Sequence, residues 1–327
     1  MSWITSEDTN VEHLLNFLMS IDINSDWVWK ACSNFMDLLY WHKRRNTVLE
    51  PKIKHLPDNH HSKPDCLLQL AMLFGGAGNH TEKKQLLKDV LKLKTERGND
   101  YRVAYALVEL GDVNRILGLL QEGVNQVKKA LEIFERIGDI GKQGYCLVAL
   151  AFALRSDNQL DAAEEAASRA IRLLLEKGEE YTVCESHRIL SSVYFCKAER
   201  EKAIRHFETA LGIASSFNWN NQLFWIHYAL AERFCDEGGF DNAHVQIQQA
   251  KSHAIEDAYR LARAVDFQAQ VYFRQCRFED ATSGGLCALE IFEKLGSLGD
   301  AEKCRDLLWL IERNVKHWNA PMVRLRE

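Results

Sequence analysis

The stretch EKAIRHFETALGIA, residues 201–214, carries small or apolar side chains at helical spacing. Ala203, Phe207, Ala210 and Ala214 follow one another at intervals of four, three and four residues. These intervals place all of them on one face of an α-helix. Because alanine at the central position lets two helix backbones approach closely, the stretch predicts a helix that packs tightly against a neighbouring helix.

The same pattern recurs along the chain at a nearly constant interval. Its first position holds a small residue in successive units, at steps of 40, 40, 40 and 38 residues: Gly123, Ala163, Ala203, Ala243 and Ala281. Seven residues later every unit has an alanine: Ala130, Ala170, Ala210, Ala250 and Ala288. Another helical pattern precedes the small position of each unit, and it repeats as well. Thirteen residues before that position stand Leu70, Leu110, Leu150, Leu190 and Leu230, and in the last unit Gln268. Each unit is therefore predicted to be a hairpin of two helices, each roughly 16–18 residues and about 25 Å long.

The composition and the positions of proline favour an all-α fold. The chain has 327 residues, 46% of them apolar, which is enough for a folded core and excludes a disordered or collagen-like chain. None of the four prolines lies between residues 65 and 320, and glycines stand at the ends of the helical patterns. Alternating strand patterns are missing, so the sequence predicts an all-α solenoid with a period of about 40 residues.

The charge balance and the apolar stretches indicate a soluble protein. A net charge of -5 and a pI near 6.2 argue against dedicated nucleic-acid binding. The first ten residues contain Glu7 and Asp8 and no basic residue, and the apolar stretches around 67–78 and 145–154 are too short to span a membrane. Nine cysteines without a CxxC pair are typical of a reducing compartment. We therefore expect a cytoplasmic location, with neither a nucleic-acid nor a membrane partner.

The extent of the repeat predicts three regions. Residues 1–63 are expected to form a divergent helical cap, with helices near 9–20 and 26–44 and a weaker segment around Pro51. Residues 64–298 hold six helical hairpins, although Lys83 fits its small position poorly. Residues 299–327 form a capping helix and tail, whose apolar residues would cover the last hairpin: Cys304, Leu307, Leu308, Ile311 and Val315. Because Gly284 and Gly285 lie inside a predicted helix, we expect the C-terminal hairpin to open first.

The hairpin pattern resembles the tetratricopeptide repeat (TPR) family. Units of that family carry Leu-small-x-x-Tyr on the first helix and Ala-x-x-x-Phe-x-x-Ala on the second, as EKAIRHFETAL does here. The period of 40 instead of 34 and the missing closing proline depart from the family pattern, and both fit longer helices. A period of 40 also overlaps HEAT and armadillo repeats, but their Pro- and Asp-marked signatures are not evident. The resemblance implies a right-handed α-solenoid with a concave groove lined by the first helices.

Three further stretches, residues 20–43, 62–79 and 159–171, are similar to the repeat region of certain mushroom-forming fungal proteins. In those proteins the repeats commonly follow a NACHT or NB-ARC nucleotide-binding module of a signalling ATPase. The resemblance implies a sensor or scaffold arm of such a switch. The nucleotide-binding module itself is missing here, because the Gly-rich segment 75–80 lacks the spacing and the lysine of a phosphate-binding loop.

The residues that could carry chemistry do not form a catalytic or metal-binding pattern. Cys184-x-x-His187 is a lone pair, whereas a structural zinc needs four ligands. A Cys196–His206 nucleophile pair is compatible with the spacing, and a Cys/His-dependent enzyme remains a remote alternative. We therefore expect a non-catalytic protein without cofactor or metal.

The repeat register predicts which side chains line the groove. The candidate partner-binding residues are Tyr105, Arg115, Tyr145, Arg155, Arg188, Trp225, Tyr228 and Arg263. Aromatic and Arg side chains are enriched at interface hot spots, although the aromatic residues could instead pack between hairpins. An acidic protein or peptide would suit the arginines, because guanidinium groups bind carboxylates in pairs of hydrogen bonds. The alternative to partner binding is a structural module that self-associates through the groove or an end cap.

Overall fold

The computed structural model describes residues 49–60, 62–76, 78–94, 100–175, 177–255 and 257–323, and within these ranges every regular element is helical. The N-terminal helices expected near 9–20 and 26–44 lie outside the described residues. The chain divides into two compact units, Met1–Gly138 and Asp139–Glu327, and each is treated by itself. Within the described ranges, no helix combines the length and the apolar character that a membrane crossing requires.

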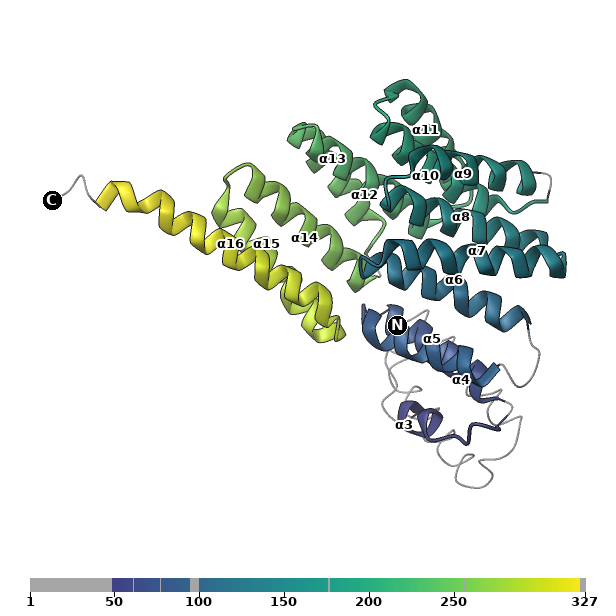
Figure 1. Cartoon of the computed structure of the whole chain (residues 1–327). Helices are drawn as coiled ribbons and strands as arrows, with labels where there is room; N and C mark the ends of the chain where they lie inside the picture. Colours follow the sequence, from purple (N-terminus) through teal and green to yellow (C-terminus); the bar gives the residue numbers. More distant parts are fainter. Residues whose placement is uncertain are drawn as a thin grey trace. The chain divides into compact units, whose positions relative to one another are not determined.

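Unit 1 contains two helical hairpins preceded by a short helix. The helices are α3 (Leu49–Lys54), α4 (Lys63–Gly76), α5 (His80–Lys94), α6 (Asp100–Ile116) and α7 (Leu120–Ile137). α4 pairs with α5 and α6 pairs with α7, as Figure 1 shows. The core of α3 to α6 contains Leu70, Phe74 and Leu87, all buried.

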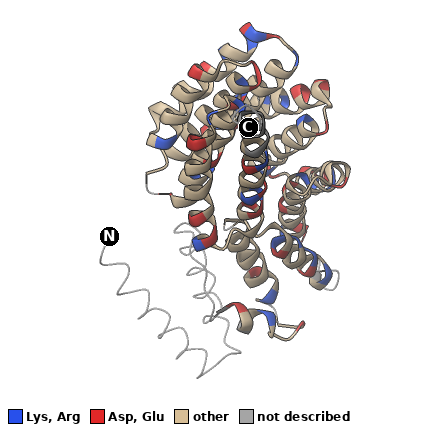
Figure 2. Ribbon diagram, turned by 90° about the vertical axis from the view of Figure 1, so that its left-hand side faces the viewer, with Lys and Arg blue, Asp and Glu red and all other residues tan. Residues whose placement is uncertain are grey.

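Unit 2 contains four hairpins and a final long helix. Its helices are α8 (Ile140–Ser156), α9 (Leu160–Leu174), α10 (Glu180–Cys196), α11 (Arg200–Ser216), α12 (Asn220–Asp236), α13 (Phe240–Ser252), α14 (Ala258–Arg274), α15 (Phe278–Leu295) and α16 (Leu298–Val323). Each even-numbered helix from α8 to α14 pairs with the helix that follows it, and α16 packs on α15 (Figure 1). Lys and Arg are interspersed with Asp and Glu along the helices (Figure 2).

The small positions of the repeat lie where helices touch, as the sequence predicts. Ala203 and Ala210 are fully buried in the seam of α10 and α11, and the thiol of Cys184 donates to the Ala210 carbonyl oxygen at 3.4 Å. In unit 1 a Cβ atom placed on Gly123 would come within 2.8 Å of the Gly111 carbonyl oxygen. The two backbones of a hairpin therefore approach each other at these positions, and a larger residue would force them apart.

A residue with positive φ ends the first helix of each hairpin. These residues recur at steps of 40, 40, 40, 40 and 38, in the order Gly78, Gly118, Asn158, Ala198, Gly238 and Cys276. The N–H of the residue that follows donates to the carbonyl five residues earlier, for example Glu199 N to Tyr194 O at 2.9 Å. This arrangement satisfies carbonyl groups at the helix end and turns the chain back for the second helix.

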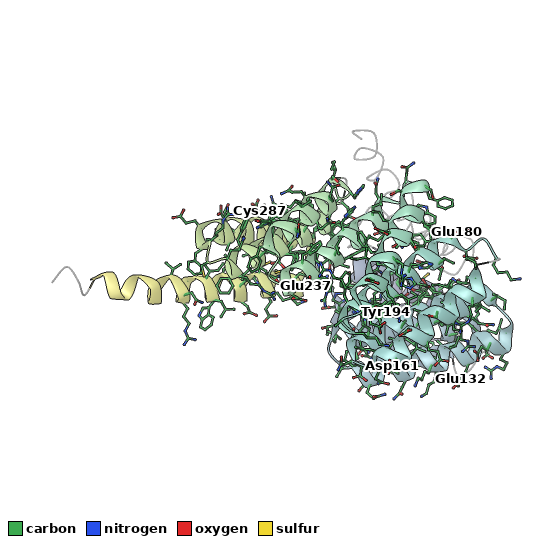
Figure 3. All side chains as sticks on the ribbon, turned by 90° about the horizontal axis from the view of Figure 1, so that it is seen from above. Glu132, Asp161, Glu180, Tyr194, Glu237 and Cys287 are labelled. Carbon is green, nitrogen blue, oxygen red and sulfur yellow. The ribbon has the colours of Figure 1, made fainter. Side chains whose placement is uncertain are left out.

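Polar contacts between successive hairpins repeat at nearly the same separation. The Arg200 guanidinium of α11 lies 2.6 Å from Glu237, which follows α12. In unit 2 Lys197 Nζ lies 2.7 Å from both Asp161 and Glu164, and Glu164 also accepts from the Tyr194 hydroxyl at 2.7 Å (Figure 3 labels Asp161 and Tyr194). The Arg200–Glu237 and Lys197–Asp161 pairs join residues 37 and 36 positions apart, so one hairpin is fixed on the next by contacts close to the repeat length.

Two irregular positions of the repeat have a structural explanation. Lys83 is buried and forms an ion pair of 2.7 Å with Glu109 of α6, and its aliphatic chain passes so close to Gly75 that a Cβ atom there would lie 2.7 Å from Lys83 Cδ. In α15, a Cβ atom on Gly284 would lie 3.1 Å from Ala269, and one on Gly285 would lie 3.0 Å from Leu308. The glycines of α15 therefore permit close contact with α14 and α16.

Candidate binding surface

The first helices of the hairpins in unit 2 lie next to one another in the order α8, α10, α12 and α14. Their side chains that do not pack against the second helices form what we call the first-helix surface. We define it by nine residues: Phe152 and Arg155 of α8, Glu185, Arg188 and Ser192 of α10, Glu232 and Arg233 of α12, and Arg263 and Asp266 of α14. These residues are partly exposed, apart from the buried Ser192.

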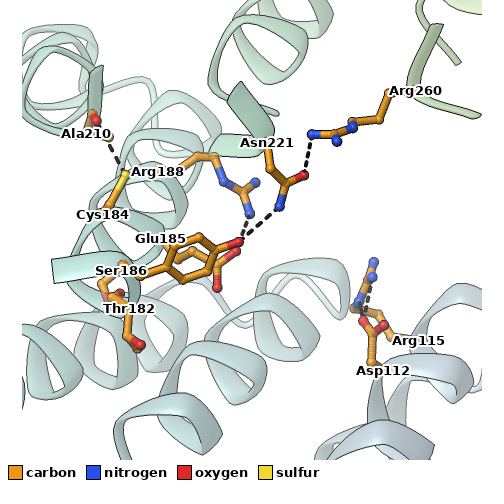
Figure 4. Close-up of polar contacts among 11 residues, drawn as sticks. Asp112, Arg115, Thr182, Cys184, Glu185, Ser186, Arg188, Ala210, Asn221 and Arg260 are labelled. Atoms are coloured by element: carbon orange, nitrogen blue, oxygen red, sulfur yellow. Dashed lines mark hydrogen bonds and ion pairs between the residues drawn. The ribbon is translucent and has the colours of Figure 1, made fainter. Parts of the chain in front are cut away.

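Two guanidinium groups occupy the α8–α10 part of this surface. Arg155 donates to the Ser192 hydroxyl on the neighbouring helix and has no carboxylate within ion-pair distance among the described residues. Burial lowers the pKa of Arg155, with Arg188 and Arg233 acting in the same direction. Arg188 lies over the Phe152 ring, 4.8 Å from its centroid, and its nearest carboxylate, Glu185, is 3.5 Å away (Figure 4). The charge of Arg155 is therefore only weakly compensated.

Two carboxylates occupy the α12–α14 part. Glu232 makes neither a hydrogen bond nor an ion pair within the described residues, and burial raises its pKa against the opposing effects of Arg233 and Arg155. Asp266 accepts from Gln270 Nε2 at 2.8 Å and from the Cys304 thiol at 3.2 Å. Burial raises the pKa of Asp266 as well. Neither carboxylate forms an ion pair within the described residues, although nearby arginines favour the charged form of each.

Arg263 is different because a polar network holds it. Its guanidinium lies 3.5 Å from Asp300 and 5.6 Å from the centroid of the Tyr228 ring. Asp300 also accepts from the hydroxyls of Tyr259, at 3.0 Å, and Ser297, at 2.9 Å. The Asp300 pKa is lowered despite burial, because Arg263 and Lys303 favour its charged form. Arg263 thus belongs to a structural network between α14 and α16.

Buried donors mark the same surface. The Nε atoms of Arg155, Arg188 and Arg263 are buried and have no acceptor among the described residues. Buried donors are nearly always paired in folded proteins, so these three N–H groups are exceptions to the usual pairing.

Two of the aromatic candidates, Tyr228 and Trp225, pack against the core of unit 2. Tyr228 is only 6% exposed and lies in the core of α12, α13 and α14, against which Trp225 also packs. Tyr145 is half-buried, with the Lys142 ammonium 5.8 Å from its ring centroid. Tyr228 and Trp225 therefore pack between helices, which is the alternative to lining a groove.

Two candidates belong to unit 1. Tyr105 and Arg115 lie on α6, both half-buried. Arg115 donates from Nε and Nη2 to Asp112 Oδ1, at 3.1 and 2.7 Å (Figure 4). Arg115 and Lys83 contribute to lowering the pKa of Asp112 against the effect of burial. The carboxylate therefore neutralises Arg115 within its own helix.

Sequence reasoning missed a polar chain across three first helices. Asn221 Nδ2 donates to the Tyr181 hydroxyl at 3.0 Å, and Arg260 Nη1 donates to Asn221 Oδ1 at 2.8 Å (Figure 4). Their separations of 40 and 39 residues are within one residue of the repeat length, so the register could have found them. It could also have found Ser192, which stands 40 residues before Glu232.

The cysteine and histidine candidates for catalysis have other partners. His206 Nδ1 lies 2.8 Å from His187 Nδ1, and the Cys196 thiol accepts from Arg233 at 3.9 Å. Burial raises the pKa of the Cys184 thiol to about 12, so this thiol stays protonated at neutral pH. Among the residues whose placement is described, no three His, Cys, Asp or Glu side chains gather as a metal site.

Comparison with solved structures identifies the architecture. A Rap protein complexed with Competence and Sporulation Factor is 15% identical, with a TM-score of 0.59 and coverage of 82% of this chain and 79% of that chain. The Rap conjugation gene regulator of the plasmid pLS20, in complex with the Phr* peptide, is 14% identical, with a TM-score of 0.54 and coverage of 81% and 79%. Yeast Tom70 is 14% identical, with a TM-score of 0.56 and coverage of 98% and 62%.

These likenesses establish the fold, an all-α TPR-like helical repeat. No family model matches the sequence, and no curated protein matches it either.

Proposed function

We propose that the protein is a non-catalytic module that binds a peptide or an extended protein segment on the first-helix surface of unit 2. The observation that carries this proposal is Arg155, a half-buried guanidinium that donates to the Ser192 hydroxyl and forms no ion pair within the described residues. Two neighbours of the same fold are complexes with Competence and Sporulation Factor and with the Phr* peptide, which supports a peptide ligand. An acidic group on the ligand would supply the missing counter-charge for Arg155 and Arg188.

Peptide titration tests the proposal. A fluorescent library of short peptides should include ligands for the wild-type protein, and Arg155→Ala should weaken their binding about tenfold. Arg172→Ala is the matched control, because Arg172 is exposed on α9, outside the first-helix surface. Equal losses for the two variants would remove the first-helix surface as the binding site.

The context that fits such a module is a signalling switch. The similarity of residues 20–43, 62–79 and 159–171 to fungal NACHT and NB-ARC proteins supports a role as the repeat arm of such a switch. The complete gene tests this role, since an upstream phosphate-binding loop in the same reading frame is expected. A gene that encodes only these repeats would argue for a free-standing binding module.

Self-association is a second candidate, favoured by the outer face of α16. Trp309 is 56% exposed and Leu310 is 41% exposed, next to the buried Ile311. Sedimentation velocity of Trp309→Ser against the wild-type protein tests this candidate. A dimer that dissociates in the variant would support it, and a wild-type monomer at high concentration would exclude it.

A further inference from the structure

We infer that the ligand of the first-helix surface is dipolar, with an acidic group over α8 and α10 and a basic group over α12 and α14. This inference rests on the proposed peptide-binding function and specifies the chemistry of the ligand. An extended segment of a partner protein that carries both charges is the occupant that the surface favours.

The cations of the α12–α14 part are already paired inside the protein. Arg233 lies 2.9 Å from Asp236, Arg263 lies 3.5 Å from Asp300, and Arg274 lies 3.4 Å from Asp236. None of them forms an ion pair with Glu232 or Asp266 within the described residues. Arg233 and Arg274 share the single carboxylate of Asp236, so they are not fully balanced, but the groups of this part that form no ion pair, Glu232 and Asp266, are both carboxylates.

In the α8–α10 part the group that forms no ion pair is a cation. The only acidic residue of the surface on these helices is Glu185, which lies 3.5 Å from Arg188. Arg155 is left with the neutral hydroxyl of Ser192 as its hydrogen-bond partner. One guanidinium and two carboxylates of the surface thus form no ion pair within the described residues, and α10 lies between α8 and α12.

Holding charges apart in this way is unfavourable for folding alone. A charged group that is partly withdrawn from water loses hydration, and without a partner it recovers little of that energy. Arg155 and Glu232 each favour the charged form of the other, yet they form no ion pair, so the fold uses only part of their attraction. A ligand with one charge of each sign would compensate both groups at once.

The spacing of the helices sets the length of this ligand. Neighbouring packed helices lie about 8–10 Å apart, so α8 and α12 are separated by roughly 16–20 Å across α10. An extended chain advances about 3.3 Å per residue, so this distance corresponds to about five or six residues. A uniformly acidic segment would instead place like charges over Glu232 and Asp266, which is repulsive.

Four labelled peptides of equal length test the inference. One has two Glu and two Lys separated by about five neutral residues, one has four Glu, one has four Lys, and one is neutral. We expect the wild-type protein to bind the dipolar peptide about tenfold more tightly than the others. Glu232→Gln should remove this preference and leave binding of the four-Glu peptide equal or tighter.

The controls separate this inference from the proposed function. Glu208→Gln changes an exposed carboxylate of α11 and should leave every affinity unchanged. If the four-Glu peptide binds the wild-type protein as tightly as the dipolar one, or if Glu232→Gln leaves the dipolar peptide unaffected, the dipolar assignment is wrong while peptide binding stands. Failure of all four peptides to bind would overturn the proposed function together with this inference.

Discussion

Ala198 and Gly238 occupy the same place in consecutive hairpins, directly after the first helix. Ala198 has a φ of 60° and Gly238 a φ of 77°. The left-handed conformation costs an L-residue with a Cβ atom about 1–2 kcal/mol, whereas glycine adopts it freely. A Cβ atom on Gly238 would meet no atom within 4 Å, so backbone strain alone decides the effect of substitution here.

Exchanging these two residues tests the conformational cost. Ala198→Gly should raise the free energy of unfolding by up to about 1 kcal/mol, and Gly238→Ala should lower it by about as much. Urea denaturation of both variants measures the changes. The same sign for both variants would show that the positive φ is not retained in solution.

Glu232 lowers the stability of the fold at neutral pH. Burial raises the pKa of Glu232, so the folded state favours the protonated carboxyl group. The stabilisation that the protonated form provides is complete below the ordinary pKa of a glutamate. It is lost as the pH rises through the pKa of the folded state. Glu232→Gln should therefore increase the free energy of unfolding at pH 7, on the order of 1 kcal/mol, and change it little at pH 4. Urea titrations at the two pH values check this, and a variant less stable at pH 7 would contradict it.

The sequence predicts on which helices the surface arginines lie, but not which groups their guanidiniums contact. Arg155, Arg188 and Arg263 all lie on first helices, and each contacts a side chain of a neighbouring first helix. Whether a guanidinium meets a hydroxyl, a ring or a carboxylate depends on the rotation between hairpins, which no short-range pattern determines. For the same reason the register could not tell that Tyr228 lies in the core.

At the scale of the element, two consecutive hairpins have equivalent polar pairs in their seams. In α10 and α11 the pair is His187 and His206, and 40 residues later His227 Nδ1 lies 2.8 Å from Gln246 Oε1. Burial lowers the pKa of His187 to about 4, and the neighbouring His206 adds to the effect. The pKa of His206 is also lowered, mainly by burial.

The two histidines make the α10–α11 hairpin sensitive to acid. Since their folded pKa values are depressed, the stabilising contribution is complete above about pH 6.5 and is lost as pH falls towards about 4. His206→Gln copies the next hairpin and should reduce this loss, whereas Gln246→His should enlarge it in α12 and α13. Thermal melts between pH 7 and pH 4 compare the variants. Parallel pH profiles for all three proteins would show that the histidine pair has no such role.

The hairpin itself could be predicted because its small positions are imposed by helix–helix contact. The expected opening of the C-terminal hairpin rested on Gly284 and Gly285 as helix-weakening residues. The structure gives these glycines a packing role against Ala269 and Leu308, which a propensity scale does not include. How easily α15 opens therefore depends on two opposing effects of these glycines: they lower the helix propensity, and they permit close packing against α14 and α16.

At the scale of the whole molecule, α16 covers an end of the helical array in unit 2. Cys304, Leu307 and Ile311 are buried, and Ala301 joins the core with Phe292 of α15. Without this cover the apolar face of the last hairpin would be in contact with water. The capping helix predicted from its apolar spacing therefore protects the array from its C-terminal side.

Two adjacent substitutions test this protection. Ile311→Glu places a charge at a position that is 2% exposed, and it should lower stability by roughly 3 kcal/mol or more and promote self-association. Leu310→Glu, at a position that is 41% exposed, should leave stability nearly unchanged. Light scattering and thermal melts measure the two effects. Equal behaviour of the variants would mean that α16 does not protect the array.

The contacts between hairpins that join residues about one repeat apart also determine how this molecule can change in length. Tandem duplication of any 40 consecutive residues within the regular part of unit 2 would recreate, at both junctions, donors and acceptors in the same relative places. Unequal recombination between neighbouring repeats can therefore lengthen or shorten the gene without disturbing the fold. Duplication of half a unit would put a second helix in the place of a first helix. Natural length variants should accordingly differ by whole units.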